Sequence, residues 1–256
     1  MQIIDTHAHL YAHDFKEDIA NVVDRATAEG VGGIILPNID SGTIDDMLEL
    51  AKNFPVCHTA MGLHPCSVKD DNTAEFNNME KWLGEKKFAG IGETGLDFHW
   101  DTSFSRQQYE SFELQIDWAK SLGIPIIIHS RKSTDECIEV VKKHQDGRLT
   151  GVFHCFSGTV EQAREIIDLG LYLGIGGVVT YKNGGLEPVL QTIGMDRVVL
   201  ETDSPYLSPV PHRGKRNEPS YLKYVVDKIA VISGFSRNKV AEITTANAQK
   251  LFGIAG

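Results

Sequence analysis

The sequence lacks the features that would place the protein in a membrane or outside the cell. None of its apolar runs reaches the roughly 18 residues that a membrane-spanning helix needs. Its N-terminus also lacks the basic-then-apolar pattern of a secretory signal. Cysteine is scarce, with 4 in 256 residues and no C-x-x-C pair. We interpret these cysteines as reduced thiols and predict a cytoplasmic protein.

Positive charge is also in short supply. The chain has 25 Lys and Arg against 35 Asp and Glu, a formal net charge of −10. This balance argues against long-range attraction to nucleic acid or to a membrane surface. DNA as a transient substrate stays open, because bound divalent cations can supply positive charge where a phosphate lies. Nothing in the sequence indicates an obligate protein partner.

What the chain does have is a regular alternation of short apolar runs and amphipathic segments, without a linker or a shift in composition. Several of the apolar runs are rich in Val and Ile, which is typical of strands buried on both faces of a parallel sheet. We expect strands at residues 2–7, 33–37, 57–62, 88–93, 125–129, 151–154, 171–174 and 198–201.

Eight strand-then-helix units in a chain of this length predict an α/β fold, a single (β/α)8 TIM-type barrel domain spanning residues 1–256. An open doubly wound sheet is the alternative, but no Gly-rich phosphate-binding turn follows the first strand. Capping-box spacings predict helix starts at Ser105-x-x-Gln108, Ser133-x-x-Glu136 and Thr159-x-x-Gln162. Two extra C-terminal helices, near residues 221–232 and 236–251, are expected on the outside.

Residue types that bind metals follow the ends of these expected strands. They are His7 and His9, His64, Glu93, His129, His154, and Glu201 with Asp203. Any one of them alone is as easily a hydrogen-bonded strand end. Together they are harder to explain structurally, because the C-terminal ends of barrel strands meet at one mouth and buried polar groups there need partners. We therefore predict two divalent ions at the mouth, bridged by Glu93.

Seven segments, in order along the chain, resemble the TatD family of metal-dependent deoxyribonucleases within the amidohydrolase-like barrels. They are residues 5–10, 62–65, 92–97, 128–131, 154–158, 200–207 and 213–219. The resemblance covers essentially the full length. It implies one metal held by His7, His9 and Glu93 with Asp203 nearby, and a second held by Glu93, His129 and His154. It also implies a 3′-to-5′ exonuclease on single-stranded DNA. The metal stays open between Mg, Mn, Zn, Fe and Ni.

Three of these residues carry catalytic hypotheses. Asp203 is expected to take the proton from the attacking water. His64 is expected to hydrogen-bond a phosphate oxygen or the leaving group, although it is also explained as a structural residue before Pro65. Glu201 is expected to orient a ligating histidine, with a buried ion pair as the alternative.

Substrate contacts are predicted in two loops. Arg213, Lys215, Arg216 and Asn217 belong to the most basic loop of the chain. This loop follows the last expected strand and suits phosphate binding, unless it is only a solvated surface loop. In the loop after the fourth strand, Phe98, His99 and Trp100 either stack on a base or close the top of the barrel.

Two other functions are consistent with the same residues. A metal-dependent hydrolase of this kind could instead cut an ester, a lactone or an amide, including the ester of a D-aminoacyl-tRNA, because the fold does not decide the substrate. A non-catalytic metal-binding scaffold is the third possibility. Asp203 beside a full ligand set argues against it, because a scaffold has no need of a base.

Overall fold

The computed structural model describes residues 2–254, in which eight strands alternate with helices. The strands are β1 (Ile3–Asp5), β2 (Val31–Pro37), β3 (Cys57–Met61), β4 (Gly90–Asp97), β5 (Ile126–Arg131), β6 (Gly151–Phe153), β7 (Tyr172–Ile175) and β8 (Val198–Leu200). The α-helices are α1 (Ile19–Ala28), α2 (Ile44–Asn53), α3 (Thr73–Glu85), α4 (Ser105–Leu122), α5 (Thr134–His144), α6 (Val160–Asp168), α7 (Leu186–Ile193), α8 (Leu222–Ser233) and α9 (Arg237–Phe252).

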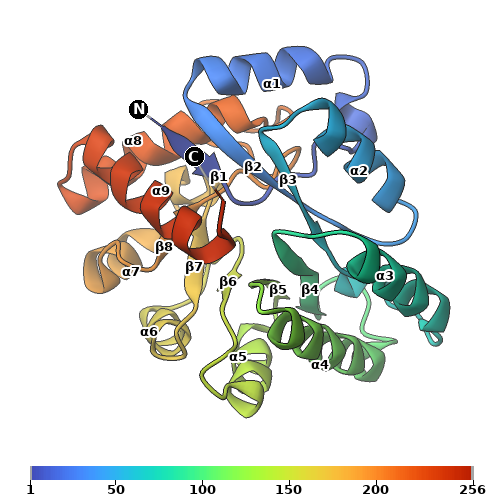
Figure 1. Cartoon of the computed structure of the whole chain (residues 1–256). Coiled ribbons are helices and arrows are strands. Elements are labelled where there is room, and N and C mark those ends of the chain that lie inside the picture. Colours follow the sequence, from blue (N-terminus) through green and yellow to red (C-terminus); the bar gives the residue numbers. More distant parts are fainter. Residues whose placement is uncertain (1, 255–256) are drawn as a thin grey trace.

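The strands form one parallel sheet in the sequential order β1 to β8. The sheet curls until its two edges meet, and the helices surround it (Figure 1). At the seam, the amide of Thr6 donates to the carbonyl of Leu200 and the amide of Asp203 donates to the carbonyl of His7, both at 2.9 Å. The predicted (β/α)8 barrel is therefore confirmed as a nearly closed barrel. The doubly wound alternative is wrong, because such a sheet does not keep its strands in sequential order.

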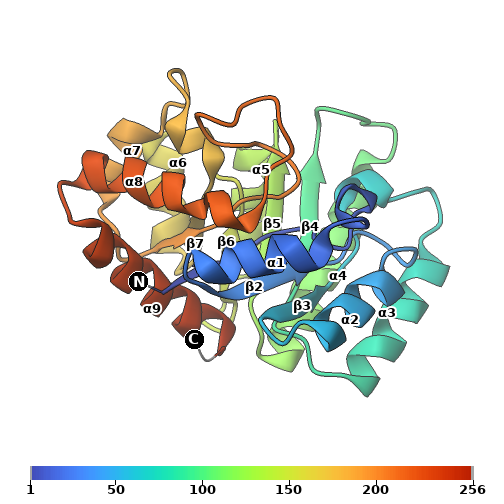
Figure 2. The ribbon, with the colours of Figure 1, turned by 90° about the horizontal axis from the view of Figure 1, so that it is seen from above.

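The two C-terminal helices have different places. Helix α8 follows β8 and completes the ring, whereas α9 covers the N-terminal ends of the strands, beside both marked ends of the chain (Figure 2). Leu251 and Phe252 of α9 pack in one cluster with Ile4 of β1 and Ile127 of β5, at the end of the barrel that α9 covers. The expectation of two outer helices is thus corrected for α9, whose apolar residues close the bottom of the barrel. The opposite mouth is left for the site.

Strand β4 runs four residues beyond its expected end and positions Glu93 inside the strand. Its pairing with β5 shifts register between Ile91 and Thr94. Gly92 lies within this irregularity at φ 146°, where L side chains are rare. An irregularity of this kind redirects a side chain relative to its neighbours. Here it brings the Glu93 carboxylate to the histidines of other strands.

One of the three expected capping boxes forms, at Thr159 and Gln162 of α6. Helices α4 and α5 also begin where expected, at Ser105 and directly after Ser133, but neither start forms a capping box. One side chain near each start binds the end of β4 instead. The Ser133 hydroxyl donates to the carbonyl of Leu96 at 2.7 Å. The Gln108 side chain accepts from the amide of Asp97 at 2.9 Å. Helix-start residues thus fix a strand end that belongs to the site.

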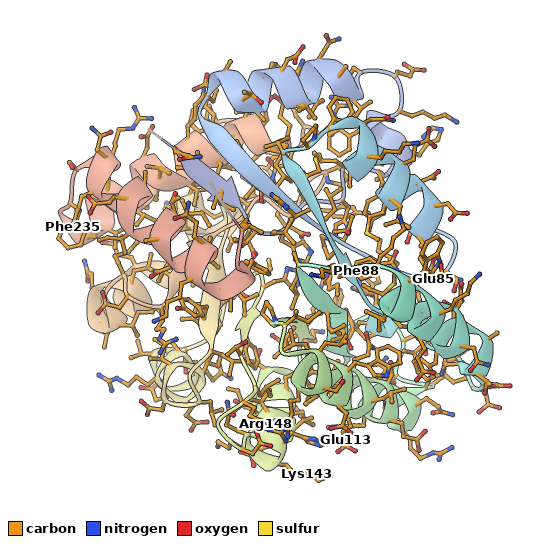
Figure 3. The ribbon with its side chains drawn as sticks, viewed as in Figure 1. Glu85, Phe88, Glu113, Lys143, Arg148 and Phe235 are labelled. Carbon is orange, nitrogen blue, oxygen red and sulfur yellow. The ribbon has the colours of Figure 1, made fainter. Side chains whose placement is uncertain are left out.

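Charged side chains cover the outside of the helix ring. Lys143 of α5 donates to Glu113 of α4 at 2.7 Å, and both are at the periphery of the molecule together with Arg148 (Figure 3). Among the described residues, no helix has both the length and the apolar character required to traverse a bilayer.

A pair of glycine substitutions tests the close packing of β4 on β5. A Cβ at Gly95, which has φ 135°, would lie 2.1 Å from the carbonyl oxygen of His129. We expect Gly95→Ala to lower the free energy of unfolding by about 2–4 kcal/mol. Gly84, in α3, has open space around the same position, so Gly84→Ala should raise it by about 0.5–1 kcal/mol. Urea denaturation measures both changes. Equal effects would contradict the packing argument.

Candidate metal centre

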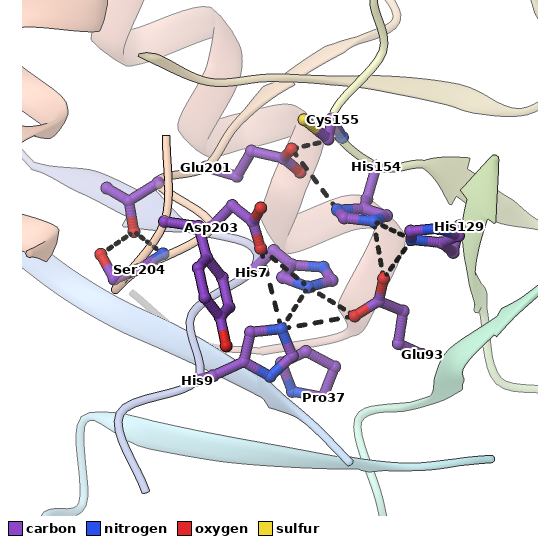
Figure 4. A network of polar contacts seen from close by, with 12 residues as sticks. His7, His9, Pro37, Glu93, His129, His154, Cys155, Glu201, Asp203 and Ser204 are labelled. Carbon is purple, nitrogen blue, oxygen red and sulfur yellow. Dashed lines mark hydrogen bonds and ion pairs between the residues drawn. The ribbon is translucent and has the colours of Figure 1, made fainter. Parts of the chain in front are cut away.

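Four histidines, supplied by three strands, lie in two pairs around the Glu93 carboxylate (Figure 4). One oxygen, Oε2, lies 3.1 Å from His7 Nε2 and 3.3 Å from His9 Nε2, both just after β1. The other oxygen, Oε1, lies 2.8 Å from His129 Nδ1 of β5 and 2.8 Å from His154 Nε2, which follows β6. The two oxygens thus divide the histidines into the two pairs that were predicted to hold separate ions.

Asp203 reaches the first pair through a buried clamp between β1 and the segment after β8. The Asp5 carboxylate accepts from the amide of Thr202 at 2.9 Å and from its hydroxyl at 2.6 Å. The next residue, Asp203, has φ 57°, a conformation that Asp tolerates better than most residues. Its Oδ1 lies 3.7 Å from the Nε2 atoms of both His7 and His9.

A tyrosine fixes the orientation of His9. The Tyr11 hydroxyl donates to the carbonyl of Pro37 and lies 2.9 Å from His9 Nδ1. Because the hydroxyl hydrogen is used on Pro37, Tyr11 must accept a hydrogen from Nδ1. The lone pair of His9 is then on Nε2, which faces Glu93.

A carboxylate does the same for His129 in the second pair. His129 Nε2 lies 2.8 Å from Asp97 Oδ2, so its Nδ1 is free to face Glu93. His154 Nδ1 lies 3.8 Å from Glu201 Oε1, which also accepts the amide of Cys155. At this distance the two groups form an ion pair and not a hydrogen bond, and His154 Nδ1 has no hydrogen-bond partner among the described residues, so the orienting role of Glu201 stays a prediction. Such outer partners set the tautomer and raise the basicity of metal-binding histidines.

The spacing within each pair tests whether a metal ion fits. Two imidazole nitrogens bound to one tetrahedral ion at about 2.0–2.1 Å would lie about 3.3 Å apart. The Nε2 atoms of His7 and His9 are 3.1 Å apart, and His129 Nδ1 is 3.3 Å from His154 Nε2. Lone pairs that face each other this closely need a cation or a proton between them. The residues therefore fit divalent ions.

Charge is strongly coupled within the cluster. Burial alone would raise the pKa of Glu93, but His154, His64 and His7 hold it well below its usual range. Burial alone would lower the pKa of His154, yet Glu93, Glu201 and Asp203 raise it to about 10. Burial raises the pKa of Glu201 to about 8. Glu93 is thus the permanent negative charge on which the cationic partners depend.

His64 lies against the same carboxylate but presents a donor. Its Nδ1 accepts the amide of Cys66 at 3.0 Å, so the neutral ring carries its hydrogen on Nε2. Burial lowers the pKa of His64, which favours that neutral ring. Nε2 lies 3.3 Å from Glu93 Oε1. Although His64, Glu93 and His129 are close enough to share an ion, this tautomer suits hydrogen bonding to a substrate.

The cluster forms the floor of a pocket of about 790 Å³ at the C-terminal ends of the strands. Arg213 and Lys215 of the predicted substrate loop line this pocket. Asn217 and Arg216 do not line it, so we drop both from the predicted substrate contacts. The Arg216 guanidinium is bound to the Asp18 carboxylate by two contacts of 2.8 Å. Asn217 is buried and donates to the carbonyls of Thr202 and Tyr206, both at 2.7 Å.

Sequence reasoning assigned no role to Asp97 and Tyr11. Asp97 carried the same signal as the other candidates, a carboxylate near a strand end within a family-like segment. Tyr11 carried no signal, because its partner Pro37 belongs to another strand and the contact exists only in the folded barrel.

The family model described as TatD related DNase matches residues 4–253. The chain belongs to the TatD family. The Bacillus subtilis protein YabD, named as an uncharacterized metal-dependent hydrolase, is 40% identical over 98% of this chain and 99% of its own length. A Salmonella typhimurium protein named 3′-5′ ssDNA/RNA exonuclease TatD is 32% identical over 98% of each chain. The crystal structure of YJJV, a TatD homolog from Escherichia coli K12, is 28% identical, with a TM-score of 0.93 over 99% of this chain and 98% of that chain.

These relationships establish the chemical class of the protein. It is a metal-dependent hydrolase acting on ester bonds. Family membership argues against the non-catalytic scaffold, and the histidine and carboxylate groups that lie within reach of shared ions agree with the family's use of metal.

Asp97→Asn tests whether the carboxylate behind His129 sets its tautomer. The remaining side-chain oxygen can still accept the amides of His99 and Trp100, as Asp97 Oδ1 does. The new NH2 group would instead donate to His129 Nε2 and move the ring hydrogen to Nδ1, the atom that faces Glu93. We expect metal affinity, measured by titration, to fall about 10- to 100-fold with the fold intact. Asp101→Asn, an exposed change in the same loop, is the control. An equal effect of the two variants would contradict the orienting role.

Proposed function

We propose that this protein hydrolyses phosphodiester bonds of single-stranded DNA stepwise from the 3′ end, using two divalent ions. The observation that supports the proposal is the Glu93 carboxylate between two pairs of imidazoles, on the floor of a pocket with Arg213 and Lys215 on its rim. The strand and direction follow the printed name of the Salmonella relative.

The ligands would be divided as the two oxygens of Glu93 divide them. His7, His9 and Asp203 would hold one ion, and His129 and His154 the other, with Glu93 shared between them. Bound divalent ions supply charge neutralisation for the phosphate and increase the acidity of the attacking water. Imidazole with carboxylate ligands suits Zn, Mn, Fe or Ni, and Mg is a further candidate.

The chain's own residues would handle the protons. Burial raises the pKa of Asp203, which makes its carboxylate a stronger base than an exposed one. Asp203 lines the pocket and would take the proton of the attacking water, a contribution of about 10²–10⁴-fold in rate. The Nε2 hydrogen of His64 would donate to a phosphate oxygen or to the leaving oxygen. Glu201 would hold His154 in its ligating orientation.

The rim cations would bind the phosphates on either side of the bond that breaks. Arg213 lies over the ring of Tyr181, 3.9 Å from its centroid, and this contact supports its guanidinium at the pocket. In a chain with net charge −10, two cations at this place concentrate phosphate attraction where cleavage would occur.

The function is tested with 5′-labelled single-stranded DNA and metal-stripped protein. We expect added Mn or Mg to restore stepwise shortening of the strand from its 3′ end. Glu93→Ala should abolish this shortening while circular dichroism shows a folded protein. Absence of cleavage by folded, metal-loaded protein would refute the proposal and direct the search to carbon-centred esters, lactones, amides and D-aminoacyl-tRNA.

Two arginines of the same loop provide a matched comparison. Arg213→Ala should raise KM for a polynucleotide about 10-fold, the loss of one charge-assisted phosphate contact, and change hydrolysis of a small phosphodiester much less. Arg216→Ala should leave KM unchanged and lower the free energy of unfolding by about 1 kcal/mol or less, because Arg216 is paired with Asp18 on the surface. Equal changes in KM for the two variants would contradict the role of Arg213 as a phosphate contact.

A further inference from the structure

Trp100 is an exposed aromatic residue held at the edge of the candidate metal centre. Its side chain is 69% exposed, yet its backbone is firmly attached. The amides of His99 and Trp100 donate to Asp97 Oδ1 at 2.8 and 3.0 Å. The other oxygen of Asp97 contacts His129 at 2.8 Å. One carboxylate thus positions both a histidine of the cluster and the segment that carries the indole.

A cation lies over the indole ring. The Arg131 guanidinium is 5.1 Å from the centroid of the Trp100 ring. Arg131 is the last residue of β5, two positions after His129. Both Arg131 and Trp100 line the 790 Å³ pocket. A guanidinium over an indole restrains the ring through a cation–π contact. The His99 ring makes a T-shaped contact with the same indole, with 4.8 Å between the centroids, and 69% of Trp100 is still exposed for a ligand.

The structure separates the two roles that the sequence left open for this loop. Phe98 is partly buried, packs against the core and lies 6.2 Å from the ring of Tyr109, so it closes the barrel top. Trp100 is not part of that packing. Of the other exposed large apolar residues, Tyr206 and Leu207 also line the pocket above the cluster, whereas Val231 and Phe235 line none of the pockets described among residues 2–254. Trp100 is the most exposed of the three that line it, at 69%.

We propose that Trp100, supported by Arg131, is a stacking platform for one nucleobase of the substrate and a determinant of its binding. The inference rests on the proposed nuclease function. Aromatic and guanidinium surfaces bind bases through their faces, regardless of base identity. In a duplex these faces are covered by neighbouring bases, so a platform of this kind selects unpaired ends. Arg213 and Lys215 line the same pocket and would bind the phosphates of the stacked nucleotide.

Steady-state kinetics on single-stranded DNA tests the platform with three variants. Trp100→Ala should raise KM about 5- to 150-fold, the range for loss of one stacked base, with little change in kcat. Trp100→Phe keeps an aromatic face and should restore most of the affinity. Val231→Ala removes a side chain that is 78% exposed on α8 and should change neither constant. Equal KM values for Trp100→Ala and Val231→Ala would overturn the inference.

A second substrate series locates the base. A base-free sugar is placed in turn at each of the last three positions of the strand. At the position where the missing base would have stacked on Trp100, the wild type should lose affinity and the Trp100→Ala penalty should disappear, since both changes remove the same contact. A penalty that persists in every base-free strand would overturn stacking. If wild-type protein cleaves none of the strands, the proposed function itself fails. Cleavage without any Trp100 effect overturns the platform alone.

Discussion

The negative charge of Glu93 inside the barrel mouth is the interaction on which the rest of the site depends. A carboxylate with both oxygens removed from water is strongly unfavourable unless cations are arranged around it. Five imidazoles lie within 3.3 Å of its two oxygens, those of His7 and His9 at Oε2 and those of His64, His129 and His154 at Oε1. Lone pairs directed at one another across these short distances are acceptable only with protons or metal ions between them. Bound metal ions would therefore also supply the positive charge that this buried carboxylate needs.

The barrel brings these partners to Glu93 from several strands. The register irregularity in β4 directs Glu93 toward the mouth, and the Asp5–Thr202 clamp brings Asp203 beside the β1 histidines. Tyr11 and Asp97 then orient the rings of His9 and His129 from behind. Asp97 has a second duty, because its other oxygen fixes the backbone of Trp100. Asp97 therefore links the orientation of His129 to the position of Trp100.

The two ends of the barrel divide stability from chemistry, as is usual for this fold. The end covered by α9 is filled by apolar side chains and carries none of the clustered ligands. The other end leaves a pocket whose floor is acidic and imidazole-rich and whose rim carries Arg213 and Lys215. The net charge of −10 argues against long-range attraction to polyanions. Under the proposed function, these two cations would attract a phosphate at the place of hydrolysis.

The amino-acid pattern by itself was sufficient for the barrel and for the chemistry of its mouth. Apolar runs of strand length are local properties of the sequence, so they predicted β1 to β8. The residue types that follow these runs are also local, and they identified His7, His9, Glu93, His129 and His154 as candidate metal ligands. What each polar side chain contacts is a property of segments far apart in the chain. Arg213 and Arg216 belong to the same basic loop, and the sequence does not distinguish their roles. In the structure, Arg216 binds Asp18 and only Arg213 lines the pocket. Ser133 and Gln108 match a helix cap, yet they bind the end of β4. Tertiary structure decided these cases because hydrogen-bond partners are chosen by proximity in space, and it decided the histidine tautomers for the same reason.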